Sequence, residues 1–187
     1  MNLRAAHLLT PLLPIVLLCI AAATDWRSRR IPNWLTATVI LTGFAQSFTP
    51  FRLCSPLEAL AGFLVGFALT FLMYAVGGRG AGDVKLMAGI GAWLGPWQVT
   101  LVFCAAAIIS MVIALAQSAA QGKLAALLHN TVLMLLNVLH VRELGTEHVI
   151  DTGRRTRSID KPMPNAVHVL IGTIAVLAWV LHSKRGG

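Results

Sequence analysis

The chain has 187 residues, of which 57% are apolar and 12% are Asp, Glu, Lys or Arg. Soluble domains average about 45–50% apolar and about 25% charged residues, so this composition excludes an ordinary water-soluble globule. Half of the charged residues lie in the last 46 positions. The net charge of +8 comes in short basic clusters between apolar segments, which is typical of the cytoplasmic loops of membrane proteins. We therefore predict a membrane protein with lipid contacts and no nucleic-acid partner.

Seven apolar segments predict an all-α chain. Most of them approach the length of about 20 residues that a membrane-spanning helix needs. A capping box at Ser55 and Glu58 predicts where the third helix begins. The fourth segment is about 16 Å long as a helix, which is too short to cross a bilayer alone. The segments are Leu8–Ala23, Trp34–Phe48, Leu57–Val76, Val84–Leu94, Trp97–Gln117, Leu124–Val141 and Ala166–Leu181.

The basic residues predict the orientation. Arg27, Arg29 and Arg30 follow the first apolar segment, whereas Arg4 alone precedes it. Because positive charge is retained in the cytoplasm, we expect the N-terminus outside and the first loop inside. A cleaved signal peptide is the alternative for the first segment, but arginines directly after it would hinder translocation.

The segment Leu124–Val141 decides the number of spans. If it crossed the membrane, the basic residues that follow it would be exported, against the charge rule. Its polar residues recur every seven positions and form one stripe, as in a helix lying in the interface plane. They are Lys123, Asn130 and Asn137. We therefore predict a polytopic protein with about six transmembrane helices and one interfacial helix, the latter within a cytoplasmic loop at 119–162.

Acidic residues are rare in the apolar part of the chain. Only Asp25, Glu58 and Asp83 precede position 142. The predicted topology brings Asp25 and Asp83 to the cytoplasmic face and Glu58 to the opposite one. A carboxylate at membrane depth is costly and tends to mark function. The alternative is a pair of unrelated helix-end carboxylates that pair with nearby arginines.

A glycine-rich turn precedes the second of these aspartates, over residues 77–83 (GGRGAGD). Glycines adopt positive φ angles and allow another backbone to approach closely, so we expect room for an extended peptide. Such a turn before a helix also binds phosphate, but Asp83 would repel an anion. Arg27 and Arg29 have an alternative role as anchors on lipid phosphates.

Two motifs resemble those of the type IV prepilin peptidases. Residues 80–86 (GAGDVKL) resemble the GxGD motif of that family, and residues 25–33 (DWRSRRIPN) resemble its first-aspartate segment. The motifs occur in the expected order and at the same predicted face. The resemblance covers about residues 15–118 and extends more loosely to the last helix, where residues 161–164 (KPMP) replace the usual proline-containing start.

The resemblance implies an intramembrane aspartic endopeptidase in the bacterial inner membrane. Its substrates would be prepilin or pseudopilin proteins, which lose a short basic leader at the cytoplasmic face. The catalytic pair would be Asp25 and Asp83, within a single membrane-embedded domain over 1–187. The matched motifs add supporting or substrate-binding residues, namely Gly80, Gly82, Lys85, Arg27, Arg29, Pro32 and Asn33. The sequence lacks the cysteine-rich zinc domain of the larger, bifunctional members, so N-methylation is not implied, and its small size is similar to that of the Tad/Flp-pilus branch.

Two carboxylates suffice to hydrolyse an amide, one as the base for a water and the other as the acid. We therefore expect no metal and no cofactor. The six histidines show no ligand spacing, and the three cysteines form no CxxC pair. Helix dipoles favour Asp83, at a helix start, as the resting carboxylate and Asp25, at a helix end, as the resting acid, although Arg27 acts in the opposite direction.

Two other classes of protein compete with a peptidase. A transporter or ion-conducting protein would use Asp25 and Asp83 as proton or cation sites. A non-catalytic subunit of a secretion machine would tolerate amide replacements at both. The sequence does not indicate how many copies of the chain associate. Finally, Gly62 and Gly66 form a GxxxG pattern that predicts a helix-packing face, at which we expect Gly62→Ala to be tolerated better than Gly82→Ala.

Overall fold

The structure, a computed structural model, describes residues 10–75, 80–139 and 163–183. Within these ranges the protein has seven α-helices and no strand, which confirms the predicted all-α class. The helices are α2 (Leu12–Ser28), α3 (Asn33–Ser47), α4 (Pro56–Ala75), α5 (Ala81–Leu94), α6 (Pro96–Ala120), α7 (Leu124–Leu139) and α10 (Asn165–Ser183).

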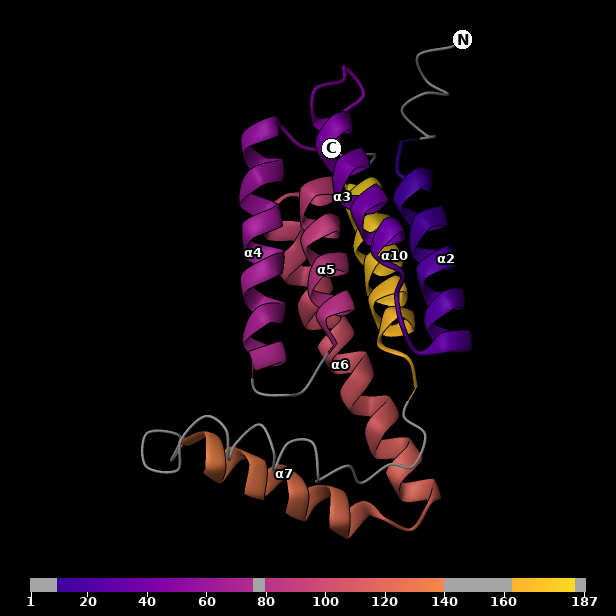
Figure 1. The fold of residues 1–187 in the computed structure, drawn as a ribbon, viewed down its shortest axis with the longest axis vertical. Helices are drawn as coiled ribbons and strands as arrows, with labels where there is room; N and C mark the ends of the chain where they lie inside the picture. Colours follow the sequence, from indigo (N-terminus) through magenta and orange to yellow (C-terminus); the bar gives the residue numbers. More distant parts are fainter. Residues whose placement is uncertain (1–9, 76–79, 140–162, 184–187) are drawn as a thin grey trace.

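Six helices form a bundle, and α7 lies across its end (Figure 1). Helices α2, α3, α4, α5 and α6 alternate in direction, and α10 starts at the end of the bundle where α2 finishes. The last turn of α2 and the first turn of α5 consequently lie at the same end (Figure 1). This is the arrangement that the charge pattern predicted for the two aspartates.

Helix α5 is the core of the bundle. From Asp83 to Leu94 every side chain except that of Lys85 is buried. A helix that is apolar on all sides is stable only when neighbouring helices cover it, and α3, α4 and α6 pack around α5. Trp93, which is 1% exposed, donates its indole N–H to the Val39 carbonyl of α3 at 3.1 Å. The helix begins at Ala81, earlier than predicted, so Asp83 lies inside its first turn.

The end of α5 opposite the aspartates is held by a buried polar network. The Gln46 side-chain nitrogen donates to the Trp93 carbonyl at 3.3 Å, and the Cys54 thiol donates to the same oxygen at 3.4 Å. The Leu53 N–H in turn donates to Gln46 Oε1 at 2.8 Å. Burial raises the pKa of the Cys54 thiol above its usual value, which keeps it neutral. The network ties the loop after α3 to α5.

The predicted capping box is present at the start of α4. The Ser55 N–H and hydroxyl donate to Glu58 Oε2 at 2.7 and 2.8 Å, and the Glu58 N–H donates back to Ser55 Oγ at 3.3 Å. Pro56 is the first helical residue, where a missing N–H costs nothing. Glu58 therefore caps a helix at the end opposite Asp25 and Asp83.

Helices α4 and α5 approach each other through glycines. A Cβ added at Gly62 would collide with the Gly91 carbonyl oxygen, and one added at Gly91 would collide with the Gly62 carbonyl oxygen. One added at Gly66 would lie 2.5 Å from the Met87 carbonyl oxygen. The predicted packing face is confirmed, but the expected tolerance of Gly62→Ala is wrong, because the facing atoms are backbone atoms that no side-chain rotation can remove.

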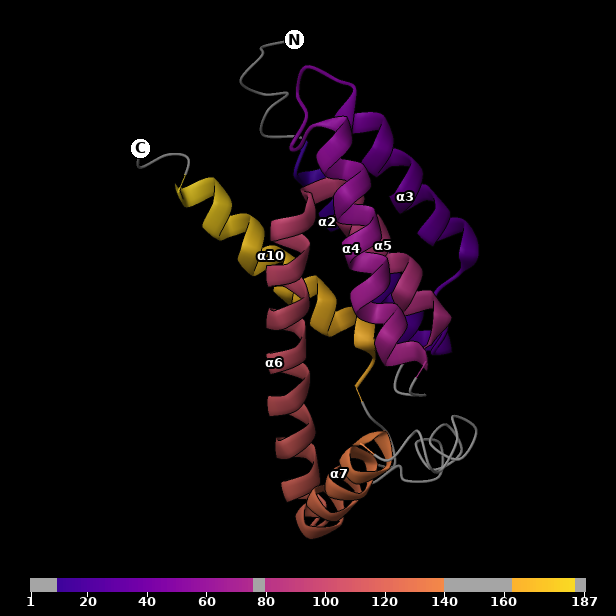
Figure 2. The same cartoon turned by 90° about the vertical axis from the view of Figure 1, so that its left-hand side faces the viewer.

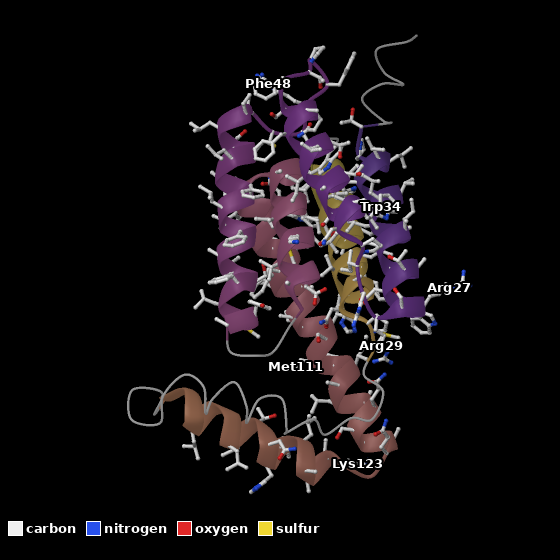
Figure 3. The ribbon with its side chains drawn as sticks, viewed as in Figure 1. Arg27, Arg29, Trp34, Phe48, Met111 and Lys123 are labelled. Carbon is white, nitrogen blue, oxygen red and sulfur yellow. The ribbon has the colours of Figure 1, made fainter. Side chains whose placement is uncertain are left out.

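Two of the described helices, α4 and α6, are long and apolar enough to cross a membrane. Both keep large apolar side chains exposed, including Phe71 and Leu72 on α4 and Val112 on α6. Met111 of α6 is exposed as well (Figure 3). Exposed apolar surface of this extent marks contact with lipid or with another protein. The crossing of the membrane by all six bundle helices stays a prediction.

Helix α7 packs on α6, which extends beyond the other helices at that end (Figure 2). Lys123 and Asn130 of the predicted polar stripe are half-buried, whereas Leu124, Leu128 and Val132 are exposed. One face of α7 is thus apolar and exposed. The side chain of Asn137 and residues 140–162 of the predicted loop lie outside the described residues, and the interfacial position of α7 stays a prediction.

We expect Gly62→Ala to destabilise the bundle by about 1–3 kcal/mol, the usual cost of overpacking, because α4 must move away from α5. The measurement is the thermal unfolding of the detergent-purified protein. Gly80→Ala is the control, because a Cβ at Gly80 meets nothing within 4 Å. Equal melting temperatures for the two variants would contradict the close α4–α5 contact.

Candidate active site

Asp25 lies in the last turn of α2 and is 8% exposed. Its carbonyl accepts the N–H of Arg29 at 2.9 Å, and Arg29 adopts a left-handed conformation with φ of 52°. A left-handed residue of this kind ends a helix and reverses the chain. The reversal leads into Pro32, whose extended backbone starts α3. The sequence after Asp25 thus folds as a tight connection between two antiparallel helices.

Asp83 lies in the first turn of α5 and is also 8% exposed. Its N–H donates to the Gly80 carbonyl at 3.1 Å, and Gly80 is extended with φ of −83°. Gly82 belongs to the helix and has no positive φ. The glycine-rich turn predicted positive φ angles, but neither Gly80 nor Gly82 has one. Residues 77 and 78 lie outside the described part of the chain.

The first turn of α10 brings the two aspartates together. The Asn165 side-chain nitrogen donates to Asp83 Oδ2 at 2.9 Å, and the backbone N–H of Ala166 donates to Asp25 Oδ2 at 3.2 Å. Because Asn165 and Ala166 are consecutive, both carboxylates lie against one turn of one helix. In the described part of the chain, Asp25 and Asp83 are the only Asp, Glu, Lys or Arg side chains that are buried.

The N-terminal ends of two helices, α5 and α10, lie against the two carboxylates. Asp83 lies at the N-terminus of its own helix, where the dipole is positive. Asp25 lies near the C-terminus of α2 but accepts an N–H from the positive N-terminal end of α10. The assignment of Asp83 as resting carboxylate and Asp25 as resting acid considered only each residue's own helix. With α10 included, helix dipoles no longer distinguish the two roles.

Two of the predicted supporting residues, Lys85 and Asn33, are in contact with each other. Lys85 is exposed and donates to Asn33 Oδ1 at 3.0 Å, which joins α5 to the start of α3. A Cβ added at Gly82 would lie 3.3 Å from the Ile31 Cβ, so the segments after Asp25 and before Asp83 are in contact.

Arg27 and Arg29 occupy the outside of this end of the bundle. Both side chains are exposed, and they lie beside the end of α2 (Figure 3). The structure therefore joins Lys85 to the motif that follows Asp25 and leaves these two arginines at the surface, where contact with lipid headgroups or with a substrate is open to them.

Sequence reasoning missed Asn165 and Ala166. The last apolar segment was expected to begin at Ala166, and only the preceding KPMP segment was singled out. An asparagine at the start of an apolar helix is a local signal for a helix terminus. That signal does not indicate which other helices the terminus meets.

No group of three or more His, Cys, Asp or Glu side chains lies together in residues 10–75, 80–139 and 163–183. The described residues thus bring two buried carboxylates to one turn of α10, and paired carboxyl groups can perform general acid–base chemistry. The prediction that no cofactor is needed stays a prediction.

Comparison with known proteins identifies the family. Residues 12–115 match the Type IV leader peptidase family, and this range includes both aspartates and both motifs. Because the match covers more than half of the chain, the protein belongs to the type IV leader peptidase family.

Individual relatives agree with this assignment. The chain is 34% identical over 107 residues to a prepilin leader peptidase/N-methyltransferase of Klebsiella pneumoniae, covering 50% of this chain and 46% of the relative. It is 40% identical over 95 residues to the protein of that name from Bacillus subtilis strain 168, and the match covers 48% of this chain and 36% of the relative. It is 30% identical over 88 residues to a preflagellin peptidase of Methanocaldococcus jannaschii, and the match covers 45% of this chain and 37% of the relative.

The matched region spans less than half the length of each of these relatives. No solved structure matches the chain.

Proposed function

We propose that the protein is an intramembrane aspartic endopeptidase that removes the short leader from prepilin-like proteins at the cytoplasmic membrane face. The observation that carries this proposal is the contact of Asp25 and Asp83 with one turn of α10 in a chain of the leader peptidase family. The relatives named prepilin leader peptidase and preflagellin peptidase support the substrate class.

The proposed chemistry uses the two carboxylates that lie against the first turn of α10. In this mechanism one member of the pair is ionised and the other is protonated. The ionised member takes a proton from a water, which attacks the scissile carbonyl, while the protonated member donates its proton to the carbonyl oxygen. The amine then leaves with a proton returned from the pair. Asp25 and Asp83 perform both transfers, and neither step needs a metal.

We propose that six helices cross the bacterial inner membrane and that α7 lies on its cytoplasmic surface. Exposed apolar side chains on α4 and α6 support contact with lipid. The exposed Arg27 and Arg29 near the aspartates support a cytoplasmic position for that end. The direction of α7 across the bundle and its open apolar face support an interfacial position (Figure 1).

The depth of the aspartates favours a peptidase over a transporter. Coupled transport sites lie near the bilayer midplane, between discontinuous helices. Asp25 is in the last turn of α2 and Asp83 in the first turn of α5, so both lie at one end of the bundle. A site at this depth is open to a peptide that enters from the aqueous side.

Asp25→Asn and Asp83→Asn should each reduce leader removal by about 10²–10⁴-fold, because each removes a group that transfers protons. Asparagine keeps an oxygen that can accept from Ala166 or Asn165, so we expect both variants to remain folded. The measurement is the fraction of a co-expressed prepilin that loses its leader, read as a mobility shift.

Glu58→Gln is the matched control for these variants. Glu58 is an exposed acidic residue at the opposite end of the bundle, so its variant should process prepilin at the parental rate. Parental processing by either aspartate variant, at equal protein level, would refute the paired-carboxylate mechanism and favour a non-catalytic subunit.

A topology measurement tests the proposed position of α7. In a variant without Cys19, Cys54 and Cys104, a cysteine at position 147 should resist an impermeant thiol reagent added to intact cells. A cysteine at Arg52, on the opposite side, should react. The 147 variant should react once the cells are permeabilised. Labelling of position 147 in intact cells would instead establish a seventh span.

A further inference from the structure

The side chain of Asn165 is directed away from its own helix. An asparagine at a helix start usually caps that helix, with its side-chain oxygen accepting an N–H of the first turn. In this structure the side-chain nitrogen of Asn165 donates to Asp83 Oδ2 at 2.9 Å, on a different helix. The amide thus contributes to the aspartate pair.

The turn that carries Asn165 is fixed in the bundle. Ala166 is 0% exposed, and its N–H donates to Asp25 Oδ2 at 3.2 Å. Further along α10, a Cβ added at Gly172 would lie 3.2 Å from the Val102 carbonyl oxygen, so α10 lies close against α6. Two donors on consecutive residues of a packed helix therefore set where both carboxylates lie.

These two donors differ in one respect. A backbone N–H is present whatever the side chain, so the contact between Ala166 and Asp25 persists through any substitution except proline. The contact with Asp83 depends on a side-chain amide. Catalytic groups must be held within about 0.5 Å of their working positions, and hydrogen bonds from neighbouring groups provide this precision.

We propose that Asn165 is a positioning residue of the peptidase site, which holds the Asp83 carboxylate in its working orientation relative to Asp25. This inference rests on the proposed leader-peptidase function. Asn165 acts through Asp83 and touches no reacting atom itself.

Four substitutions separate positioning from packing. Asn165→Ala removes the donor and the bulk. Asn165→Leu keeps the bulk without any polar atom. Asn165→Asp keeps the shape but replaces the donor with a carboxylate oxygen, which repels Asp83. Asn165→Gln keeps a donor on a longer side chain.

The experiment measures kcat and KM of the purified full-length protein on a synthetic prepilin peptide that spans the leader junction. Misplacing a reacting group by about 1 Å can cost on the order of 100-fold in rate. We therefore expect Asn165→Ala, Asn165→Leu and Asn165→Asp to lose about 100-fold in kcat with little change in KM. Asn165→Gln should recover part of this loss.

Thr173→Val is the matched control on the same helix. The buried Thr173 hydroxyl donates within its own helix, to the Val169 carbonyl at 2.8 Å, so its variant should keep the parental kcat.

Three results would overturn the inference. Parental kcat in Asn165→Leu, which has no polar atom, is one. A lower melting temperature that accounts for the loss in every Asn165 variant is another. Faster cleavage by Asn165→Ala than by the parent is the third, because it would make the amide an obstacle to substrate. Failure of the parent protein to cleave the peptide would overturn the proposed function itself.

Discussion

The structure depends on the need to satisfy two buried carboxylates at one end of an apolar bundle. A carboxylate removed from water without hydrogen-bond donors is strongly unfavourable, so each must find a donor within the protein. Asp25 and Asp83 find theirs on the first turn of α10, the last helix of the described chain. This requirement fixes the depth of α10 and closes the bundle, because the helix must start where the aspartates lie.

The position of Asp83 follows in turn from the burial of α5. This helix has 14 residues and is covered on all sides, so it cannot slide without opening the core. The contact of Gly62 with Gly91 fixes the axial position of α5 relative to α4. The hydrogen bond of the Trp93 indole fixes it relative to α3. A short, tightly held helix therefore fixes the position of the side chain at its first turn, which the proposed mechanism requires because misplacement by about 1 Å can cost on the order of 100-fold in rate.

Much of this arrangement could be predicted from local sequence. The capping box at Ser55, the brevity of the fourth apolar segment and the common depth of Asp25 and Asp83 all follow from spacing and charge. Each of these features depends on residues close together in the chain or on the alternation of helices across a membrane. The family motifs then identified which acidic residues belong together.

The errors concern contacts between distant segments. The role of Asn165 depends on where three helices meet, and no local pattern encodes that meeting. The expected tolerance of Gly62→Ala failed because the space at a glycine depends on the partner helix, here the backbone of Gly91. The dipole assignment of the aspartates, which stays a prediction, rests on α2 and α5 and does not include the N-terminus of α10.

The central claim is that the segments that follow Asp25 and precede Asp83 meet in one site. Paired cysteines at Ile31 and Gly82, in a chain without native cysteines and with a protease site between α3 and α4, test it directly. A Cβ at Gly82 lies 3.3 Å from the Ile31 Cβ, close to the distance of about 3.5–4.5 Å that a disulfide needs. After mild oxidation, the two protease fragments should therefore migrate as one covalently linked species on a denaturing gel, and a reductant should separate them. A pair at Ile31 and Gly80 should not link them, because a Cβ at Gly80 meets nothing within 4 Å. Separation of the fragments in the Gly82 pair, or equal linkage in both pairs, would contradict the account.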